Sequence, residues 1–407
     1  DYFLCKWARI EHMTNTSPAD ALIIGGGLVG LSIALALGRV GLRVAVIDRD
    51  RPADLAADRF DGRASAIALG SARVLQGLGL WADLAAHAQP ILDIRVSDGD
   101  SLLFLHYDHR EVGDEPLGYI IENRFTRRAL YAALARVANV SLIAPAEVAA
   151  LERASTRVNA RLADGRVIAA RLAIACDGRN SPMREAAGIR SVAWRYPQHG
   201  IVCSVAHEHP HNGVAHERFL PAGPFAMLPL PRSPDGANRS SIVWTERAEL
   251  VSTMMALDDA AFAAEIARRF GGSLGAISVA GPRWSYPLAL VHAERYTAPR
   301  LALAGDAAHA IHPIAGQGLN LGLRDVAALA ETLADAARLG QDIGTADVLA
   351  RYERWRRFEQ QHGGDHGEHV RRRRRQPHRT NAARGCYDHA RDVVHVRLPR
   401  PANRDRR

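Results

Sequence analysis

The feature that most constrains the fold is a glycine-rich turn between two apolar runs near the start of the chain. Residues 21–24 read as a short buried strand, and a Gly-x-Gly-x-x-Gly turn follows at 25–30. Helical apolar spacing runs over 31–40, and a second buried strand occupies 42–48. This strand–turn–helix–strand order favours an α/β unit over a transmembrane helix, because glycines and a second strand interrupt the uncharged run.

Each glycine of the turn has a separate task in a dinucleotide-binding fold. Gly25 permits the tight turn, Gly27 lets a pyrophosphate approach the backbone, and Gly30 lets helix and strand pack closely. The helix N-terminus offers free N–H groups and a partial positive charge to the phosphates. Asp48, at the end of the second strand, is placed to accept hydrogen bonds from an adenosine ribose. The motif predicts dinucleotide binding without distinguishing FAD from NAD(P), and a turn that serves packing alone is the alternative.

Two later segments repeat the pattern of a buried strand that ends in an acidic turn. Residues 173–178 are apolar and end in an Asp-Gly pair, which on its own is more often a plain turn. Residues 301–306 are apolar and end in a Gly-Asp pair. A Pro/Gly-rich loop then opens a long helix with apolar residues on one face.

This combination of motifs resembles the single-component flavin aromatic hydroxylases, the para-hydroxybenzoate hydroxylase class. Within that class, residues 312–325 (HPIAGQGLNLGLRD) match, position for position, the signature of the ubiquinone-biosynthesis hydroxylases of the octaprenylphenol/methoxyphenol type. The resemblance covers residues 18–358 in the right motif order. The long signature is specific, whereas the two short motifs mainly confirm the order.

The resemblance implies an α/β fold with a Rossmann-like FAD-binding domain (GR2 type), an inserted antiparallel β-sheet substrate domain and a C-terminal helical or irregular tail. Short apolar runs between Pro, Gly and Asn turns in the middle of the chain also favour such a sheet. The boundaries that we expect are 18–80, 115–190 and 291–345 for the FAD-binding domain, 81–114 and 191–290 for the substrate domain, and 346–360 for a C-terminal helix.

The resemblance also implies roles for residues. Asp306 would bind the ribityl chain of FAD, and Gly316 to Gly318 would bring N–H groups and a helix N-terminus against N1 and the C2 carbonyl of the flavin. Asp177 and Gly178 would lie near the pyrophosphate, and this pair is also linked to NAD(P)H use in the class. The full set of cofactor-binding residues that we expect is Gly25, Gly27, Gly30, Asp48, Arg63, Asn123, Arg124, Asp177, Gly178, Gly305, Asp306, Pro313, Gly316, Gln317, Gly318 and Asn320.

Several of these assignments compete with structural alternatives. Arg63 lies in a loop (61–66) similar to the flavin-side arginine loop of the family, and a solvated loop arginine is the alternative. Asn123 lies in a turn similar to another FAD-contacting turn, and a plain helix N-cap is the alternative. For His309 and His312 we favour structural hydrogen bonding over acid–base catalysis, so no catalytic residue is assigned. The histidines between 199 and 216 fit an exposed turn better than a metal site, and we expect no metal.

The implied activity is that of a FAD-dependent NAD(P)H monooxygenase. It would hydroxylate the ring of a polyprenylated phenol in ubiquinone biosynthesis with O2, through a flavin C4a-hydroperoxide. Such an apolar substrate implies a peripheral-membrane or biosynthetic-complex encounter, at the cytoplasmic side of the inner membrane. The alternatives are a hydroxylase of a soluble aromatic acid, a flavin reductase, a halogenase (whose tryptophan motif is not evident), and a FAD-binding scaffold or inactive member because of the aberrant C-terminus.

Charge and composition separate the two ends of the chain from its middle. Residues 361–407 carry 13 arginines and five acidic residues, which account for the whole net charge of +8. We therefore expect no nucleic-acid partner for the folded part, and interpret this basic segment as a disordered or frameshifted tail, with a basic arm as the alternative. Residues 1–12 precede Met13 and hold the chain's one lysine, which favours a non-native extension. Four scattered cysteines favour a reducing, cytoplasmic setting.

Overall fold

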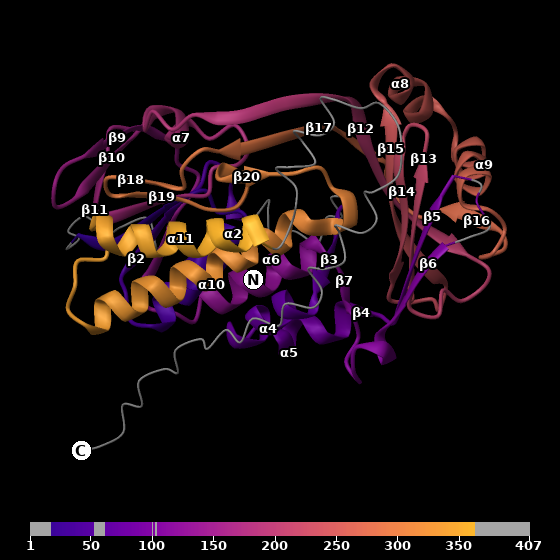
Figure 1. Ribbon diagram of the computed structural model, residues 1–407, viewed down its shortest axis with the longest axis horizontal. Coiled ribbons are helices and arrows are strands. Elements are labelled where there is room, and N and C mark those ends of the chain that lie inside the picture. The colour runs from indigo at the N-terminus through magenta and orange to yellow at the C-terminus, as the bar shows by residue number, and fades with distance from the viewer. Residues whose placement is uncertain (1–17, 53–61, 100, 102–103, 363–407) are drawn as a thin grey trace.

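The computed structural model describes residues 18–52, 62–99, 101 and 104–362 of the chain (Figure 1). The expected extension at 1–12 and the basic segment from 363 onward lie outside the described residues. Two sheets form opposite ends of an elongated molecule, and the long strands β12 and β17 run from one end to the other (Figure 1). Among the helices that the structure describes, none has both the length and the apolar character needed to cross a membrane.

The first sheet has eight strands, with parallel strands at its centre. Its order is β18-β19-β11-β1-β2-β8, and β10 and β9 continue from β11. β1 pairs in parallel with both β11 and β2, and β11 pairs in parallel with β19. The strands are β1 (Ala19–Ile24), β2 (Val44–Ile47), β8 (Val140–Ile143), β9 (Val148–Arg153), β10 (Val158–Leu162), β11 (Val167–Ala175), β18 (Thr297–Ala298) and β19 (Leu301–Leu303).

Because these central strands are parallel, their carboxyl ends meet at one edge of the sheet. Ile24 aligns with Ile47 on one side and with Ala175 on the other, and Ala175 aligns with Leu303. The next residues of all four strands therefore emerge side by side. This edge collects the glycine turn, Asp48, the Asp-Gly pair and the Gly-Asp pair that the sequence singles out.

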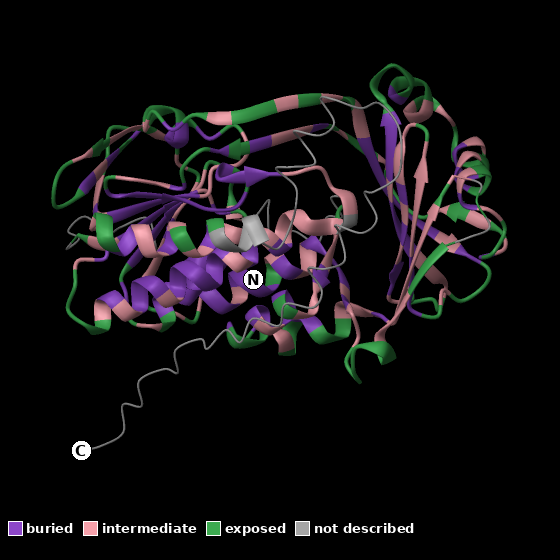
Figure 2. Ribbon diagram, viewed as in Figure 1, coloured by how far each residue is buried: buried purple, intermediate pink, exposed green. Residues whose placement is uncertain are grey.

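Long helices cover this sheet and bury its apolar face (Figures 1 and 2). α2 and α10 cross so closely that a Cβ at Gly322 would lie 2.5 Å from Val29 Cγ2. Leu31 and Leu35 of α2 and Leu329 of α10 are completely buried in the core. The helices of this end are α2 (Leu28–Arg39), α4 (Leu69–Gly77), α5 (Trp81–Leu84), α6 (Asn123–Leu134), α7 (Pro182–Ala186), α10 (Gln317–Arg338) and α11 (Ala346–His362).

The second sheet has nine strands in the order β20-β17-β12-β15-β14-β13-β5-β6, with β16 beside β12. Its pairs are antiparallel except β13 with β5, which pair in parallel. α8 (Ala248–Ala256) and α9 (Asp259–Phe270) cover its outer face, where Trp244 and Phe262 are buried. The strands are β5 (Asp93–Asp98), β6 (Phe104–Asp108), β12 (Ser191–His207), β13 (Val214–Leu220), β14 (Gly223–Leu230), β15 (Asn238–Arg247), β16 (Ile277–Val279), β17 (Trp284–Ala293) and β20 (His309–Ala310).

A third, three-stranded sheet lies between the two ends of the molecule. Its order is β3-β7-β4, formed by β3 (Ala64–Ala68), β7 (Gly118–Glu122) and β4 (Ala88–Ile91). Its inner side contacts the second sheet through Ile91, Ile120 and Leu230. Single 3₁₀ turns complete the described chain at Ala85–His87, His109–Glu111, Gly305–Ala307 and Ile314–Gly316.

Candidate functional site

The glycine turn after β1 leaves its backbone open on one side. Gly25 has φ +105°, and a Cβ there would lie 2.3 Å from the carbonyl oxygen of Cys176. A Cβ at Gly30 would lie 2.0 Å from the carbonyl oxygen of Gly25. Gly27 is exposed, and a Cβ there would meet no other described segment within 4 Å. Two glycines thus permit close packing, whereas the third faces open space at the N-terminus of α2.

Asp48 braces this turn from the end of β2. Its Oδ2 accepts a hydrogen bond from the backbone N–H of Gly26, and its Oδ1 accepts one from Asp50 N at 2.7 Å. A Cβ at Gly26 would lie 2.9 Å from Asp48 Oδ2, so Gly26 is also needed here. The Gly-x-Gly-x-x-Gly motif does not mark Gly26, although this residue stands between its first two glycines. Asp48 remains partly accessible and retains lone pairs for a ligand hydroxyl.

The Asp-Gly pair after β11 carries an unsatisfied acceptor. Asp177 Oδ2 accepts from Met183 N at 3.1 Å, whereas Oδ1 is buried and has no hydrogen-bond partner among the described residues. Burial raises the pKa of Asp177, against hydrogen bonds from Ser181 and Met183 that lower it. Gly178 has φ +87°, and a Cβ there would meet no other described segment within 4 Å.

Asp306 lies in the 3₁₀ turn that follows the carboxyl end of β19. Its side chain is accessible to solvent, yet surrounding protein atoms desolvate the carboxylate and raise its pKa. His309, Arg179 and Arg63 act in the opposite direction on this pKa, so these residues lie near the carboxylate. Arg63 is exposed, and Gly305 holds the turn at φ +60°.

The loop before α10 approaches β3. Gly316 has φ +62°, and a Cβ there would lie 2.9 Å from Ala66 Cβ. Asn320 is buried, and its amide donates to Ala66 O at 2.7 Å and Gly316 O at 3.0 Å. Its Oδ1 accepts from Ala68 N at 2.9 Å. Asn320 therefore fastens the loop to β3 through its whole carboxamide.

The remaining residues of this loop are more accessible than Asn320. Pro313, Gln317 and Gly318 are half-buried, and a Cβ at Gly318 would meet no other described segment within 4 Å. Gln317 begins the 22-residue helix α10, so the positive end of a long helix dipole lies here.

The turn before α6 is more buried than the sequence indicates. Asn123 accepts from Ser65 Oγ at 2.6 Å, and its backbone N–H donates to Arg63 O at 3.0 Å. The alternative that Asn123 is the N-cap is wrong, because Glu122 occupies that position. Arg124 lies 2.8 Å from the buried carboxylate of Glu122, and this ion pair holds its guanidinium close to its own backbone.

Side chains that the sequence analysis did not select surround the Gly-Asp turn. Asp325, His309 and Arg356 form a buried ionic cluster behind it, and Arg184 is buried beside it. The signal for Asp325 is its place as the last residue of the long signature. Arg184 and Arg356 carry no local signal, since a buried arginine is exceptional.

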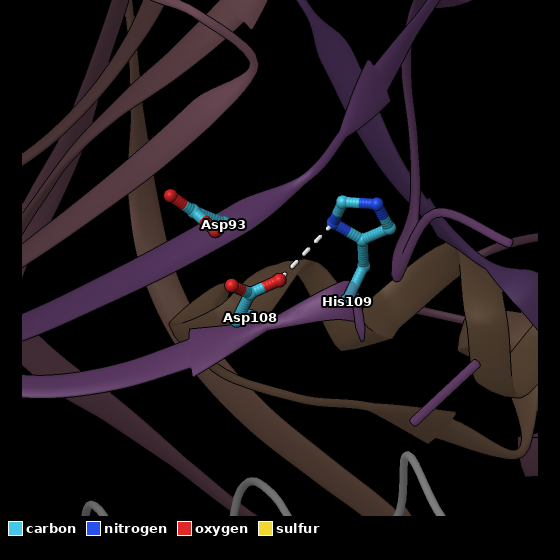
Figure 3. Close-up of side chains that lie close together, drawn as sticks. All are labelled: Asp93, Asp108 and His109. Atoms are coloured by element: carbon cyan, nitrogen blue, oxygen red, sulfur yellow. Dashed lines mark ion pairs between the residues drawn. The ribbon is translucent and has the colours of Figure 1, made fainter. Parts of the chain in front are cut away.

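A cluster of Asp93, Asp108 and His109 in the second sheet has metal-ligand chemistry (Figure 3). Its candidate ligand atoms lie within 4.8 Å of one another. Arg110 Nε, however, lies 3.0 Å from both oxygens of Asp108 and lowers its pKa, and His109 Nδ1 lies 3.0 Å from Leu92 O. We assign no metal to this cluster, because Arg110 already neutralises the negative charge that Asp108 would otherwise offer to a cation.

The histidines between 199 and 216 also have structural partners. His207 is buried, with its two ring nitrogens 2.7 Å from His209 O and 3.0 Å from Ser240 Oγ. His211 Nε2 lies 2.9 Å from Leu230 O. The expected exposed turn is therefore wrong for His207, whose ring stabilises the sheet.

The open side of the first sheet fits an extended dinucleotide. Gly27, Gly178 and Gly318 all lack a neighbouring described segment where a side chain would stand. The N-termini of α2 and α10 supply positive dipole ends at separate points. Asp177, which lies between these two helices in the chain, has an Oδ1 without a hydrogen-bond partner in the described part of the chain. The N–H groups at the helix N-termini are suited to phosphates, and the carboxylate oxygens are suited to sugar hydroxyls.

Comparisons with known proteins agree with this geometry. A family model described as "FAD binding domain" matches residues 18–361. The chain is 52% identical over 339 residues to the ubiquinone hydroxylase UbiL of Rhodospirillum rubrum, covering 83% of this chain and 78% of that protein. It is 38% identical to the 3-demethoxyubiquinol 3-hydroxylase of Escherichia coli, covering 84% and 86%. The structure of Pseudomonas aeruginosa PqsL with 2-aminobenzoylacetate is similar, with a TM-score of 0.71 and 26% identity over 84% of this chain and 92% of that one.

Proposed function

This chain belongs to the FAD-binding ubiquinone-biosynthesis hydroxylases, and we propose that it hydroxylates the aromatic ring of a phenolic ubiquinone precursor with NAD(P)H and O2. The observation that carries the proposal is the shared carboxyl edge of the first sheet, where the ends of β1, β2, β11 and β19 align. The glycine turn, Asp48, the Asp-Gly pair and the Gly-Asp pair follow these strand ends, as binding of an extended FAD molecule requires. Bound FAD would accept a hydride from NAD(P)H and supply the oxygen chemistry.

The chain's own residues would bind and orient this cofactor. Asp48 would accept from the adenosine ribose, the open faces of Gly27 and Gly178 would admit the pyrophosphate, and Asp306 would accept from the ribityl chain. The N-terminus of α10, at Gln317, would stabilise negative charge on the flavin ring.

Aromatic residues of β17 would form the wall opposite the flavin loop. The ring of Tyr286 packs on Gly200, where a Cβ would lie 3.0 Å from Tyr286 Cε2. Burial raises the pKa of Tyr286, although Arg63 and Arg179 lie close enough to lower it, so the phenol stays protonated at neutral pH. Trp284 covers Gly62, where a Cβ would lie 2.1 Å from Trp284 Cδ1. A neutral hydroxyl and an apolar wall suit the orientation of a phenol ring away from bulk water.

A finer proposal concerns the substrate's tail and location. We propose a polyprenylated phenol, met at the cytoplasmic side of the inner membrane or in a biosynthetic complex. The names of the relatives support it, because ubiquinone precursors carry such tails. Exposed apolar side chains at the outer strand β6, Phe104 and Leu105, offer surface of the required kind. Flotation of the purified protein with anionic liposomes tests the membrane part, and protein that stays at the bottom of the gradient contradicts it.

The central experiment is a flavin spectrum of the purified protein followed by an NAD(P)H oxidation assay. We expect a yellow protein whose NAD(P)H oxidation rises with a prenylated phenol and matches the hydroxylated product measured by mass spectrometry. A soluble aromatic acid that is hydroxylated faster would favour that alternative substrate class. Bound flavin without turnover would favour a scaffold, and a colourless protein would end the proposal.

A further inference from the structure

We infer that Asp325 and Arg356 are positioning residues that hold the turn bearing Asp306 toward the cofactor, which makes α11 part of the cofactor site. The inference rests on the proposed FAD-dependent function. It concerns two residues that are completely buried next to this turn and would touch no ligand themselves. The geometry of three groups around one buried carboxylate carries it.

The carboxylate of Asp325 holds both ends of the turn segment. Its Oδ2 accepts from the backbone N–H of Gly305 at 2.7 Å and from His309 Nε2 at 2.7 Å. Its Oδ1 accepts from Arg356 Nε at 2.5 Å. Gly305 directly precedes Asp306, and His309 follows three residues after it, so one α10 side chain binds the backbone before the ligand-facing acid and an imidazole after it.

Arg356 makes this arrangement electrostatically possible. Asp325 and Arg356 are both completely buried, and an unpaired carboxylate at such a position is costly. Burial alone would raise the pKa of Asp325, but the charges of His309 and Arg356, with hydrogen bonds from His309 and Gly305, outweigh burial and lower it. The ionised carboxylate can therefore accept from three donors at once.

The position of Arg356 is fixed by the rest of α11. Tyr352 donates from its hydroxyl to Leu303 O at 2.8 Å, on the strand that leads into the turn. Glu353 accepts from Tyr296 N at 2.8 Å and from Thr297 Oγ1 at 2.7 Å. Side chains of three residues along one helix thus reach β19, its neighbour β18 and the carboxylate that holds the turn.

A second buried arginine holds the turn from the other side. Arg184 donates from Nη1 to Ala307 O at 2.9 Å and from Nη2 to Arg179 O at 3.0 Å. Ala307 directly follows Asp306, and Arg179 directly follows the Asp-Gly pair of β11. The backbone next to Asp306 is therefore fixed before it by Asp325 and after it by Arg184, while the Asp306 side chain itself stays accessible.

The test compares three variants of the full chain: Arg356→Met, Arg356→Lys and the control Arg354→Met. Arg354 is exposed on the same helix, so its substitution changes one charge without touching the turn. A fourth variant, Val348→Ala, opens a cavity at a buried α11 position far from the carboxylate cluster in the helix. For each, FAD binding to the flavin-free protein is titrated by fluorescence, visible circular dichroism of the bound flavin is recorded, and the melting temperature is measured.

We expect Arg356→Met to raise the Kd for FAD by roughly tenfold, the scale seen when a group that orients a ligand-binding residue is removed, and to alter the flavin dichroism. Arg356→Lys should recover part of the FAD affinity and part of the dichroism. The control Arg354→Met should change neither quantity. If Arg356→Met does not fold, Arg356→Lys is judged by the same two readouts. The inference is overturned if Kd is unchanged, or if Val348→Ala raises Kd equally for the same fall in melting temperature. Failure of the proposed function is separate, because it would appear as wild-type protein without flavin or turnover.

Discussion

Asp306 combines two properties at the residue scale that an isolated surface acid does not have. It is accessible to a ligand, and it is crowded enough by protein atoms that its pKa is raised. In the flavin-free protein the charged form of Asp306 therefore slightly destabilises the folded state. A ligand that donates hydrogen bonds to the carboxylate would relieve this desolvation, which couples cofactor binding to folding.

Replacing Asp306 by Asn should separate stability from binding. Since the folded pKa is raised, the charged form destabilises the flavin-free protein above that pKa, and Asp306→Asn should raise its melting temperature at neutral pH by on the order of 1 °C. The difference should vanish at low pH, where Asp306 is protonated in both folded and unfolded chains. FAD should bind the variant about tenfold more weakly, since a charged acceptor is lost. Exposed Asp83→Asn is the control, and unchanged FAD affinity in Asp306→Asn would contradict the assignment.

His216 should set part of the acid sensitivity of the second sheet. Burial, aided by Arg95 and Arg218, lowers the pKa of His216 from 6.5 to about 4. Because the folded pKa lies below the unfolded value, stability is complete above pH 6.5 and falls as the pH drops toward 4. The loss should be roughly 2 kcal/mol. Urea unfolding at pH 7.5 and 5.0 measures this loss. The stability of His216→Gln should depend less on pH than that of wild type, whereas the stability of the exposed control His106→Gln should not. An equal pH dependence of stability in all three proteins would refute the role of His216.

At the scale of the element, two glycines of the turn and helix after β1 should respond differently to alanine: one substitution mainly weakens FAD binding, and the other mainly lowers stability. Gly27→Ala places a methyl in open space and should cost about 0.5–1 kcal/mol, the usual preference of an N-cap for glycine over alanine. It should nevertheless weaken FAD binding about tenfold or more, because the methyl stands where the pyrophosphate approaches. Gly30→Ala places its Cβ 2.0 Å from Gly25 O and should cost about 2 kcal/mol or more in stability.

Paired measurements of urea stability and FAD affinity check this contrast. Gly70→Ala in α4, where a Cβ also meets no other described segment, is the control for an alanine at a permissive position. A Gly27→Ala protein that unfolds early, or that keeps wild-type affinity for FAD, would contradict the division of tasks.

The sequence predicted the first sheet better than the second for a physical reason. Parallel buried strands are continuous apolar runs that end in special turns, so β1, β2, β11 and β19 are visible locally. The long signature likewise marks the start of α10. By contrast, the parallel pairing of β13 with β5 joins segments more than a hundred residues apart, and no local pattern specifies it.

The cofactor assignments show the same limit. The strand ends bring Gly25, Asp48, Asp177 and Asp306 to one edge of the sheet, as expected from parallel order. Asn320 fastens its loop to the backbone of β3, which lies about 250 positions earlier in the chain. Sequence periodicity is a local signal and does not predict a contact over this separation. Assignments to the ligand itself remain predictions until FAD is bound.

At the scale of the whole molecule, Glu122 joins the two ends. This buried carboxylate of β7 lies 2.8 Å from Arg124 Nη2 of α6 and 2.7 Å from Arg239 Nη2 of β15. Glu122→Gln would leave two guanidinium groups without their counter-charge and should cost about 3 kcal/mol. Exposed Glu249→Gln is the matched control.

Amide hydrogen exchange tests this link directly. Glu122→Gln should accelerate exchange in β7 and in the Arg239 end of β15, whereas β1 and β11 should keep their protection. Uniform acceleration across both sheets would mean that the carboxylate stabilises the molecule globally and does not act as a joint between its ends.

The strand order of the parallel sheet has a consequence for the synthesis of the polypeptide itself. Its central strand β11 has β1 on one side and β19 on the other, and β19 is made more than 270 residues after β1. The buried guanidinium behind Asp306 follows later still, at Arg356. A growing polypeptide on the ribosome therefore cannot complete a flavin pocket until nearly all of this length has emerged. Until then the edge of β11 that β19 later covers has no partner, and such an apolar edge exposes the nascent protein to aggregation before the vitamin-derived ligand can bind.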